Sequence, residues 1–509
     1  MKTGWNLLTG TLTRYVLLFV NIAVGIFLMP FTVQHLGKAE YGLWMLTASF
    51  TAYLQLLDLG YGNGLVRQVT HADALGDENE MNVILSTFAV VYSVIGFTAL
   101  VIVAGLAAFI LPRFPNLSPE DVRTAQVVLL VLGLRAAVGF PMGVFGAVTT
   151  ARQRFAATSG IAIAVTLLQA AATYWVLRTG YGLVPLVSVT TIIGLASYAA
   201  YAAVAKSAFP GMRLSPALFS RRQMREVTAY SMYLFMITLA IQFGYNIDNV
   251  VIAAVAGTSA VAVYSVAFRV ADYQRQLCNQ FNGLLFPVVV RFSAADEMAA
   301  MRATLIDGTR FAVGMITGVT ICLFTVADRL IVIWMGSDFT DALPPLYVLA
   351  LAGIVLVGAG PLGNLLLARG RHRLVAYACA GEAAANLLLT LVLVGSYGIV
   401  GAAIGTALSV SVANLFVQMP AACRLLGVPV RRFLAEVAGP AMLASVPAAT
   451  AAWLLRSALT AAPLLELVGA GLLVGSVYLT AFVALGLSRV ERARYVGSLR
   501  ELTTAFRTP

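Results

Sequence analysis

The sequence has few charged residues and almost no lysine. Asp, Glu, Lys and Arg together make up 11% of its 509 residues, and lysine occurs only three times. A soluble domain carries about 25% charged residues, so this composition excludes an ordinary soluble protein. There is no Gly-x-x-x-x-Gly-Lys-Ser/Thr segment, which excludes ATP hydrolysis through a P-loop. The net charge of +11 does not indicate nucleic acid, because basic residues collect in the cytoplasmic loops of membrane proteins.

Cysteine and histidine are also scarce, with four and three residues respectively. The cysteines lie within or at the ends of apolar stretches and form no Cys-x-x-Cys pair. Neither a disulfide framework nor a zinc site is therefore indicated. The histidines are scattered near the ends of the predicted helices. We expect no metal site, no cofactor and no catalytic residue.

Long apolar segments dominate the chain instead. Hydrophobic residues make up 60% of it and the mean hydropathy is +0.88. Segments long enough to cross about 30 Å of hydrocarbon recur along its whole length, separated by short turns that often contain glycine. They predict an all-α polytopic membrane protein with about fourteen transmembrane helices. The predicted helices cover residues 9–36, 40–68, 82–111, 121–150, 155–177, 183–206, 227–256, 259–291, 304–335, 342–368, 373–394, 399–422, 433–456 and 464–487.

The distribution of basic residues predicts the orientation. With both termini in the cytoplasm, 24 of the 33 Lys and Arg residues fall on the cytoplasmic side, five on the opposite side and four within helices. This split follows the positive-inside rule through every loop. The first helix is predicted to be retained, because its apolar run is too long for a signal peptide and lacks a clear cleavage site. The longest segment outside the membrane runs only from Ser207 to Arg225.

Three pairs of short motifs recur at nearly equal offsets. Residues 151–154 (ARQR) match 368–371 (ARGR), residues 181–184 (YGLV) match 397–400 (YGIV), and Gly37 precedes Gly257 by 220 positions. Helices 1–6 and 7–12 are therefore predicted to be two copies, which lie parallel because six is even. Such repeats are typical of two-lobed transporters. The predicted division is an N-lobe at 1–206, a cytoplasmic linker at 207–226, a C-lobe at 227–424, and helices 13–14 with a tail at 425–509.

Three segments resemble a known family. Residues 36–44 (LGKAEYGLW) and 56–64 (LLDLGYGNG), followed by Arg67, are similar to the polysaccharide-transporter family. This is the Wzx-type branch of the multidrug/oligosaccharidyl-lipid/polysaccharide exporter superfamily, abbreviated MOP. Residues 382–403 look like the helix 11–12 hairpin of the same family. The resemblance covers essentially the whole chain, with helices 13 and 14 added after the twelve-helix repeat.

The resemblance implies a function in the bacterial inner membrane. Members of this branch move undecaprenyl-diphosphate-linked oligosaccharide repeat units from the cytoplasmic to the periplasmic leaflet. The expected role is flipping such units by alternating access for O-antigen, exopolysaccharide or capsule synthesis, without enzymatic chemistry. The expected partners are the lipid-linked oligosaccharide, membrane lipid, and a polysaccharide polymerase with its chain-length regulator.

Ionisable residues inside the predicted helices are the candidate site residues. Such residues cost about 2.5–3.5 kcal/mol at mid-bilayer on insertion scales, so they normally face a cavity or a partner. Guanidinium groups suit phosphate oxygens, which makes the arginines candidates for holding the diphosphate. The substrate-binding candidates are Arg14, Arg135, Arg269, Arg275 and, from the glycine-rich segment, Asn63. The candidate coupling or structural acids are Asp58, Asp248, Asp272 and Glu382.

Depth within the helices leaves structural pairing open for several of these residues. Asp248 and Arg269 lie at similar distances from the turn at Gly257, and Asp58 and Arg14 at similar distances from the turn at Gly37. Arg135 has no acid at matching depth on its hairpin partner, so a role in a lumen is favoured. Arg269, Asp272 and Arg275 are three residues apart and are expected to share a helix face.

Three other functions remain open. A membrane glycosyltransferase or polymerase would need carboxylates or basic clusters on substantial outward loops, whereas the longest outward segment here runs from about Pro112 to Glu120. A cation-coupled multidrug antiporter of the same superfamily would favour an acidic cavity. A lipid II flippase of the same superfamily is the third alternative. The sugar, the coupling ion and the oligomeric state cannot be read from the sequence.

Overall fold

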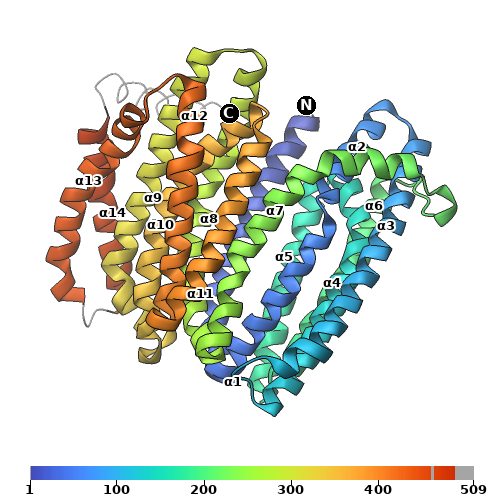
Figure 1. The fold of residues 1–509 in the computed structure, drawn as a ribbon, viewed down its shortest axis with the longest axis horizontal. Coiled ribbons are helices and arrows are strands. Elements are labelled where there is room, and N and C mark those ends of the chain that lie inside the picture. The colour runs from blue at the N-terminus through green and yellow to red at the C-terminus, as the bar shows by residue number, and fades with distance from the viewer. Residues whose placement is uncertain (1, 460–462, 488–509) are drawn as a thin grey trace. The chain divides into compact units, whose positions relative to one another are not determined.

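The computed structural model describes residues 2–459 and 463–487, and every regular element in these ranges is a helix (Figure 1). The chain divides into two compact units. The first is Met1–Ser265 with Leu391–Ile399, and the second is Val266–Thr390 with Val400–Pro509. The lobes predicted at 1–206 and 227–424 stay a prediction.

The first unit is built mainly from six long helices. Its elements are α1 (Lys2–Tyr53), η1 (Leu54–Asp58), α2 (Tyr61–Leu75), α3 (Glu78–Gly105), η2 (Leu106–Ile110), η3 (Leu111–Arg113), α4 (Pro119–Ala151), α5 (Phe155–Arg178), α6 (Leu183–Ala208), η4 (Pro216–Leu218) and α7 (Arg221–Ala256). Within this unit, α4, α5 and α6 begin and end within two residues of the predicted helices. The first helix and α7 begin seven and six residues before the predicted positions, and the chain departs from the prediction around residue 59.

The predicted helix over residues 40–68 is wrong in one respect. The chain leaves the helix at Leu59 and Gly60, which both have positive φ (51° and 76°), and α2 begins afresh at Tyr61. Hydropathy does not reveal such a break, because residues on both sides are apolar. Glycine populates positive φ readily, and Gly60 therefore supplies the break. The glycine-rich segment is thus a junction between helices and not the interior of one.

Close contacts between helices hold the first unit together. In Figure 1, α3 and α4 run side by side, and a Cβ at Gly96 would lie 2.3 Å from the carbonyl oxygen of Ala137. No larger residue fits there without separating the two helices. Phe88 and Leu85 of α3 and Val148 of α4 are fully buried in the adjoining core. Burying an aliphatic or aromatic side chain of this size stabilises a fold by about 1.5–3 kcal/mol.

The second unit takes in most of α8 and the helices that follow it. Gly398, at φ 56° and ψ −140°, divides α11 into two arms, close to where the sequence predicts a turn. The elements are α8 (Thr258–Ala294), α9 (Met298–Met335), η5 (Ser337–Ala342), α10 (Leu343–Ala368), α11 (His372–Ser411), the π-helical segment η6 (Val412–Gln418), α12 (Met419–Leu426), α13 (Val430–Leu459) and α14 (Leu464–Gly486).

The last two helices pack against α9, where glycines of α9 leave room for aromatic rings of α14. A Cβ at Gly314 would lie 2.6 Å from the ring of Phe482, and one at Gly318 would lie 2.7 Å from the ring of Tyr478. Arg310, which is buried, donates from Nε to the carbonyl oxygen of Glu436 at 2.7 Å. α13 and α14 are therefore an integral part of the second unit.

Two of the three repeated motifs adopt the same backbone conformation in both copies. The third does not, because Gly182 has φ −87° and ψ −159° whereas Gly398 has φ 56° and ψ −140°. At the turn after α4, Gln153 has φ 53°, and the amide of Arg154 donates to Thr149 O at 2.8 Å. At the turn after α10, Gly370 has φ 72°, and the amide of Arg371 donates to Leu366 O at 2.8 Å. Gly37 and Gly257 also match, with φ/ψ of 78°/168° and 84°/170°.

Ten helical stretches of the described chain are long and apolar enough to cross a membrane. The protein is therefore an all-helical polytopic membrane protein. Two stretches are long enough for two crossings, because Thr13–Asp58 has 46 residues and His372–Leu426 has 55, whereas about 20 residues suffice for one. Gly37 and Gly398 break these two stretches. The total of fourteen transmembrane helices stays a prediction.

Candidate functional site

Asp58 lies at the junction between η1 and α2, where the chain folds its carboxylate back onto the next helix. The carboxylate accepts a hydrogen bond from the amide of Gly62 at 3.2 Å and one from the hydroxyl of Tyr92 at 2.8 Å. The first bond satisfies an amide at the start of α2 that has no partner inside the helix. The second ties this junction to α3. Asp58 is thus a fixed acceptor in the first unit.

Arg14 does not pair with Asp58 in the structure. Its guanidinium lies over the ring of Phe155, 4.3 Å from the ring centre. A cation–π contact of this kind contributes about 0.5–1 kcal/mol at an exposed site. Arg14 and Asp58 are at similar depth in the predicted hairpin, but they have different partners. α1 packs on α5, which brings Arg14 to Phe155, and Asp58 is held by Tyr92.

Arg135 is the middle residue of α4 and lies against α6. A Cβ at Gly194 would lie 2.6 Å from its Cζ, so the guanidinium rests where the missing side chain of Gly194 leaves room. Within the described part of the chain no carboxylate pairs with this guanidinium, and no hydrogen bond from it is found. Arg135 is therefore a half-buried cation in mid-helix without an ion pair among the described residues.

Asp248 is 2% exposed and accepts a hydrogen bond from the hydroxyl of Tyr264 at 2.6 Å. The neighbouring Asn249 donates to Ser49 of α1 at 3.0 Å. The partner predicted for Asp248, Arg269, belongs to the other unit and is exposed. Their pairing stays a prediction.

The charged residues of α8 separate into a buried pair and an exposed arginine. Arg275 and Asp272 form an ion pair at 3.1 Å, and their side chains are 5% and 15% exposed. Arg275 also lies 5.2 Å from the ring centre of Phe268, and Gln276 donates to Asp272 at 2.7 Å. Arg269 is exposed, so the three charges predicted to share a face do not share one environment.

Glu382 is held by an amide and not by a cation. The Nδ2 of Asn414, in the π-helical segment η6, donates to it at 3.4 Å, and Gln418 donates to Asn414 at 3.2 Å. No arginine or lysine within the described ranges forms an ion pair with Glu382. A groove of about 590 Å³ between the two arms of α11 and η6 is lined by Glu382 and otherwise mostly by apolar side chains.

A polar seam continues from Glu382 along the two arms. Asn386 accepts hydrogen bonds from the hydroxyls of Thr390 and Thr406, both at 3.2 Å. Glu382, Asn386 and Thr390 are four residues apart and so share one helix face. Sequence reasoning treated Glu382 alone and missed this seam. The four-residue spacing of polar residues in an apolar segment was the available signal.

Asn63 is exposed on α2, and no hydrogen bond of its side chain is found within the described ranges. Among the predicted charged residues that the structure describes, Asp272 and Arg275 form an ion pair. In the described chain no group of three or more His, Cys, Asp or Glu residues lies together as a metal site would require.

Residues 35–344 match the family of polysaccharide biosynthesis proteins. Two relatives are similar over shorter stretches. The probable low-salt glycan biosynthesis flippase Agl15 of Haloferax volcanii is 27% identical over 193 residues, which is 38% of this chain and 41% of the relative. The teichuronic acid biosynthesis protein TuaB of Bacillus subtilis is 27% identical over 161 residues, 31% of this chain and 33% of the relative. The chain thus matches less than half the length of either.

Solved structures share the fold over most of the chain. The inward closed conformation of the lipid II flippase MurJ superposes with a TM-score of 0.71 at 13% identity, covering 93% of this chain and 98% of that one. An inward-facing multidrug resistance transporter of the MATE family and MOP superfamily has a TM-score of 0.69 at 14% identity, covering 81% and 95%. Because the family match spans more than half of the sequence, the chain belongs to the polysaccharide biosynthesis protein family.

Proposed function

We propose that the protein is a flippase for undecaprenyl-diphosphate-linked oligosaccharide repeat units, moving them from the cytoplasmic to the periplasmic leaflet of a bacterial inner membrane. The headgroup of such a lipid cannot cross hydrocarbon unaided, because each desolvated charge costs several kcal/mol or more. The transport would proceed by alternating access, with fourteen helices, two parallel six-helix copies and both termini in the cytoplasm. The matching backbone torsions at Gln153 and Gly370, and at Gly37 and Gly257, support the two copies.

The observation that carries this proposal is the environment of Arg135. A cation in the middle of a membrane helix is costly, and a purely structural arginine would be expected to have an acidic partner, as Arg275 has in Asp272. Arg135 has none among the described residues, so its charge suits an anionic ligand. A guanidinium can form two parallel hydrogen bonds with phosphate oxygens, which is the geometry that a diphosphate offers.

The test compares variants at Arg135 and at Gly194. We expect Arg135→Ala to lower flipping by about tenfold or more, because a hydrogen bond to a charged group contributes about 1.5–3 kcal/mol. Arg135→Lys should restore it only in part, since an ammonium lacks the fork. Gly194→Ala should also lower it, because the added Cβ would displace the guanidinium. The measurements are surface polysaccharide, lipid-linked units on the cytoplasmic leaflet, and protein abundance in the membrane.

The matched control is Arg178→Ala, which removes an exposed arginine at the end of α5 and should leave flipping unchanged. Loss of lipid II transport and cell-wall synthesis in the deletion strain, with surface polysaccharide intact, would replace the proposed substrate with lipid II. Altered resistance to cationic drugs with both glycans intact would favour an antiporter. Normal flipping by Arg135→Ala would refute the role of this residue.

The energy source is proposed to act through Glu382. Glu382 lines an open groove and forms no ion pair within the described ranges, so it can exchange a cation. Of the other three acids, Asp58 is held by Tyr92, Asp248 by Tyr264 and Asp272 by Arg275. Glu382 is therefore the acid that best fits a coupling role.

A further inference from the structure

The segment between α6 and α7, residues 209–220 and here called the linker, is fastened along the first turns of α3. Asn82 donates to Gly211 O at 3.0 Å and accepts from the Arg213 amide at 2.7 Å. Ser86 donates to Arg213 O at 3.2 Å and accepts from the Ser215 amide at 3.1 Å. Two side chains one turn apart thus replace the partners that a neighbouring strand would give this stretch of backbone.

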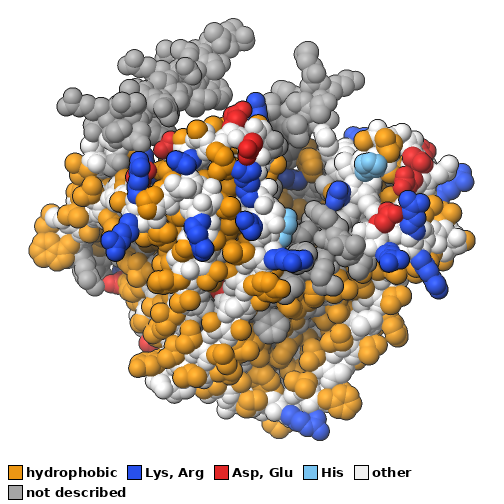
Figure 2. Space-filling model, turned by 45° about the horizontal axis from the view of Figure 1, so that its top comes forward, with side chains coloured by type: hydrophobic (Ala, Val, Ile, Leu, Met, Phe, Trp, Pro, Cys, Tyr) orange, Lys and Arg blue, Asp and Glu red, His pale blue; other side chains and the backbone are white. Residues whose placement is uncertain are grey.

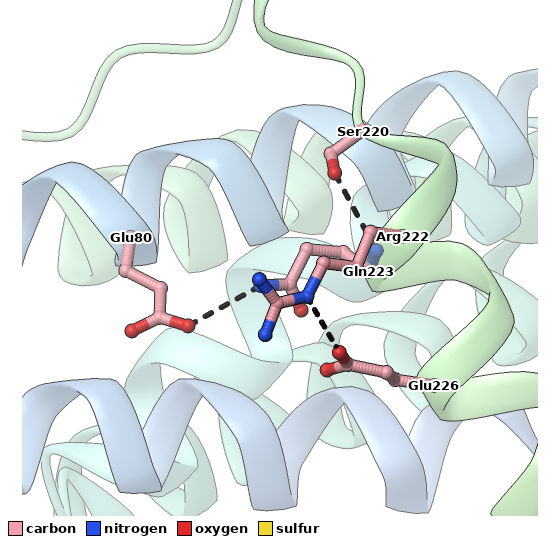
Figure 3. A network of polar contacts seen from close by, with 5 residues as sticks. All are labelled: Glu80, Ser220, Arg222, Gln223 and Glu226. Atoms are coloured by element: carbon pink, nitrogen blue, oxygen red, sulfur yellow. Dashed lines mark hydrogen bonds and ion pairs between the residues drawn. The ribbon is translucent and has the colours of Figure 1, made fainter.

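The end of the linker is held in the same way, as Figure 3 shows in part. The hydroxyl of Thr87 accepts a hydrogen bond from the amide of Ser220. The hydroxyl of Ser220 caps α7 by accepting one from the amide of Gln223 at 3.5 Å. The side chain of Gln223 donates to Glu80 of α3 at 3.2 Å. The linker is therefore a fixed part of the surface of the first unit.

A groove of about 520 Å³ lies where the linker meets α3. Val90, Val94 and Phe97 of α3 form one wall, and Leu214 and Pro216 of the linker form the other. Val94 is 61% exposed and Phe97 is 68% exposed, and both belong to a stretch apolar enough to cross a membrane. One wall thus belongs to a stretch able to cross a membrane, and the other belongs to the polar linker that follows α6. Such a groove suits a lipid whose chain lies along α3 and whose headgroup is level with the linker.

Most arginines in and after the linker form no ion pair within the described residues. Arg222 is the exception, because its Nε donates to Glu226 at 2.9 Å. This hydrogen bond raises the pKa of the guanidinium. Arg213, Arg221 and Arg225 are exposed, and no acid within the described residues pairs with them. Of the nearby acids, Glu80 and Glu226 have partners of their own, whereas the carboxylate of Glu78 lies against Gly211 of the linker. Figure 2 shows basic side chains concentrated toward one end of the visible face, above a mainly hydrophobic surface.

We propose that this groove is a binding site for an anionic phospholipid of the membrane, with one chain against Val90, Val94 and Phe97 and the phosphate near Arg213. A juxtamembrane Lys or Arg gains about 1 kcal/mol from anionic headgroups, whereas a zwitterionic headgroup offers no such gain. The bound lipid would fill the groove and hold the linker to α3. The site is separate from Arg135 and does not depend on the transported substrate.

The test measures lipid binding to the purified full-length protein in detergent. Thermal unfolding is followed while phosphatidylglycerol, phosphatidylcholine with the same chains, or inorganic phosphate is added. We expect phosphatidylglycerol alone to raise Tm in a saturable way. Arg213→Gln should weaken its apparent affinity about fivefold, the factor that corresponds to the roughly 1 kcal/mol of one interfacial arginine. Val94→Trp should abolish the effect, because the indole fills the groove while every arginine remains.

Two controls remove the same groups elsewhere. Arg431→Gln removes an exposed arginine at the start of α13, and Val446→Trp enlarges an exposed valine on α13. Both should bind phosphatidylglycerol as the unmodified protein does. Equal effects of the two phospholipids would overturn the proposal, as would an equal effect of inorganic phosphate, which would indicate a soluble-anion site. Unchanged affinity of Arg213→Gln would overturn it as well, even if Val94→Trp failed to fold.

Discussion

Arg275 and Arg135 both lie within long helices, but their surroundings differ. Arg275, in the second unit, is paired with Asp272 at 3.1 Å and lies close to the ring of Phe268. Arg135, in the first unit, rests against Gly194 and has no acid among the described residues. Arg275 therefore has an acidic partner within the fold, whereas Arg135 has no acidic partner among the described residues. Removing a partner should therefore destabilise the protein in the first case, whereas removing the charge itself should impair function in the second.

The largest effect on stability is expected from breaking the buried pair of the second unit. Asp272→Ala leaves the Arg275 guanidinium, 5% exposed, without its carboxylate, which costs about 3–5 kcal/mol for a buried pair. We expect a lower Tm and a lower abundance in the membrane. Asp272→Asn combined with Arg275→Gln should recover most of the loss, because no unpaired charge remains. If Asp272→Ala were as stable as the unmodified protein, the contrast with Arg135 would disappear.

A smaller effect is expected at the junction of the first unit. Tyr92→Phe keeps the ring that packs in the core of α3 and removes the hydroxyl that donates to Asp58 at 2.8 Å. A hydrogen bond to a charged group contributes about 1.5–3 kcal/mol, so Tm should fall by less than in Asp272→Ala. Tyr174→Phe, on the exposed side of α5, is the matched control and should leave Tm unchanged. Equal values for the two variants would mean that Asp58 does not need Tyr92.

The smallest effect on stability, with a clear effect on transport, is expected at Glu382. Glu382→Gln replaces a carboxylate held by one amide at 3.4 Å and leaves no charge unpaired, so the free energy of unfolding should change by less than about 1 kcal/mol. Flipping in proteoliposomes should no longer respond to an imposed proton or sodium gradient. Glu466→Gln, at the exposed start of α14, should respond normally. A normal response by Glu382→Gln would move the coupling role to another acid.

Much of the fold follows from hydropathy, because ten helical stretches of the described chain are apolar over at least the thickness of a bilayer. The bounds of α5, predicted at 155–177 and found at Phe155–Arg178, are typical. The break at Leu59 and Gly60 could not be predicted in this way, since a non-helical residue in an apolar segment leaves the hydropathy unchanged. Only the recurrence of Gly60, Gly62 and Gly64 indicated that the helix is unusual there.

The candidate site was predicted only where its partners are local in sequence. Asp272 and Arg275 are three residues apart on one helix, and the structure pairs them. The contact of Arg14 with Phe155 and that of Asp58 with Tyr92 join residues of different helices. Such contacts depend on which helices pack together, and depth along a hairpin does not determine that. For the same reason Asn414 could not be assigned to Glu382 from the sequence.

The junction at Gly37 has a consequence for how the chain enters the membrane during synthesis. Its torsions, φ 78° and ψ 168°, lie in a region that is essentially restricted to glycine, and one residue there reverses a stretch of 46 apolar and helical residues. Helix continues on both sides of Gly37, so no polar loop between the two arms would have to cross the membrane separately. The arms would leave the insertion machinery together as a preformed hairpin, and a side chain at position 37 would be expected to interfere at that step, before the finished fold exists.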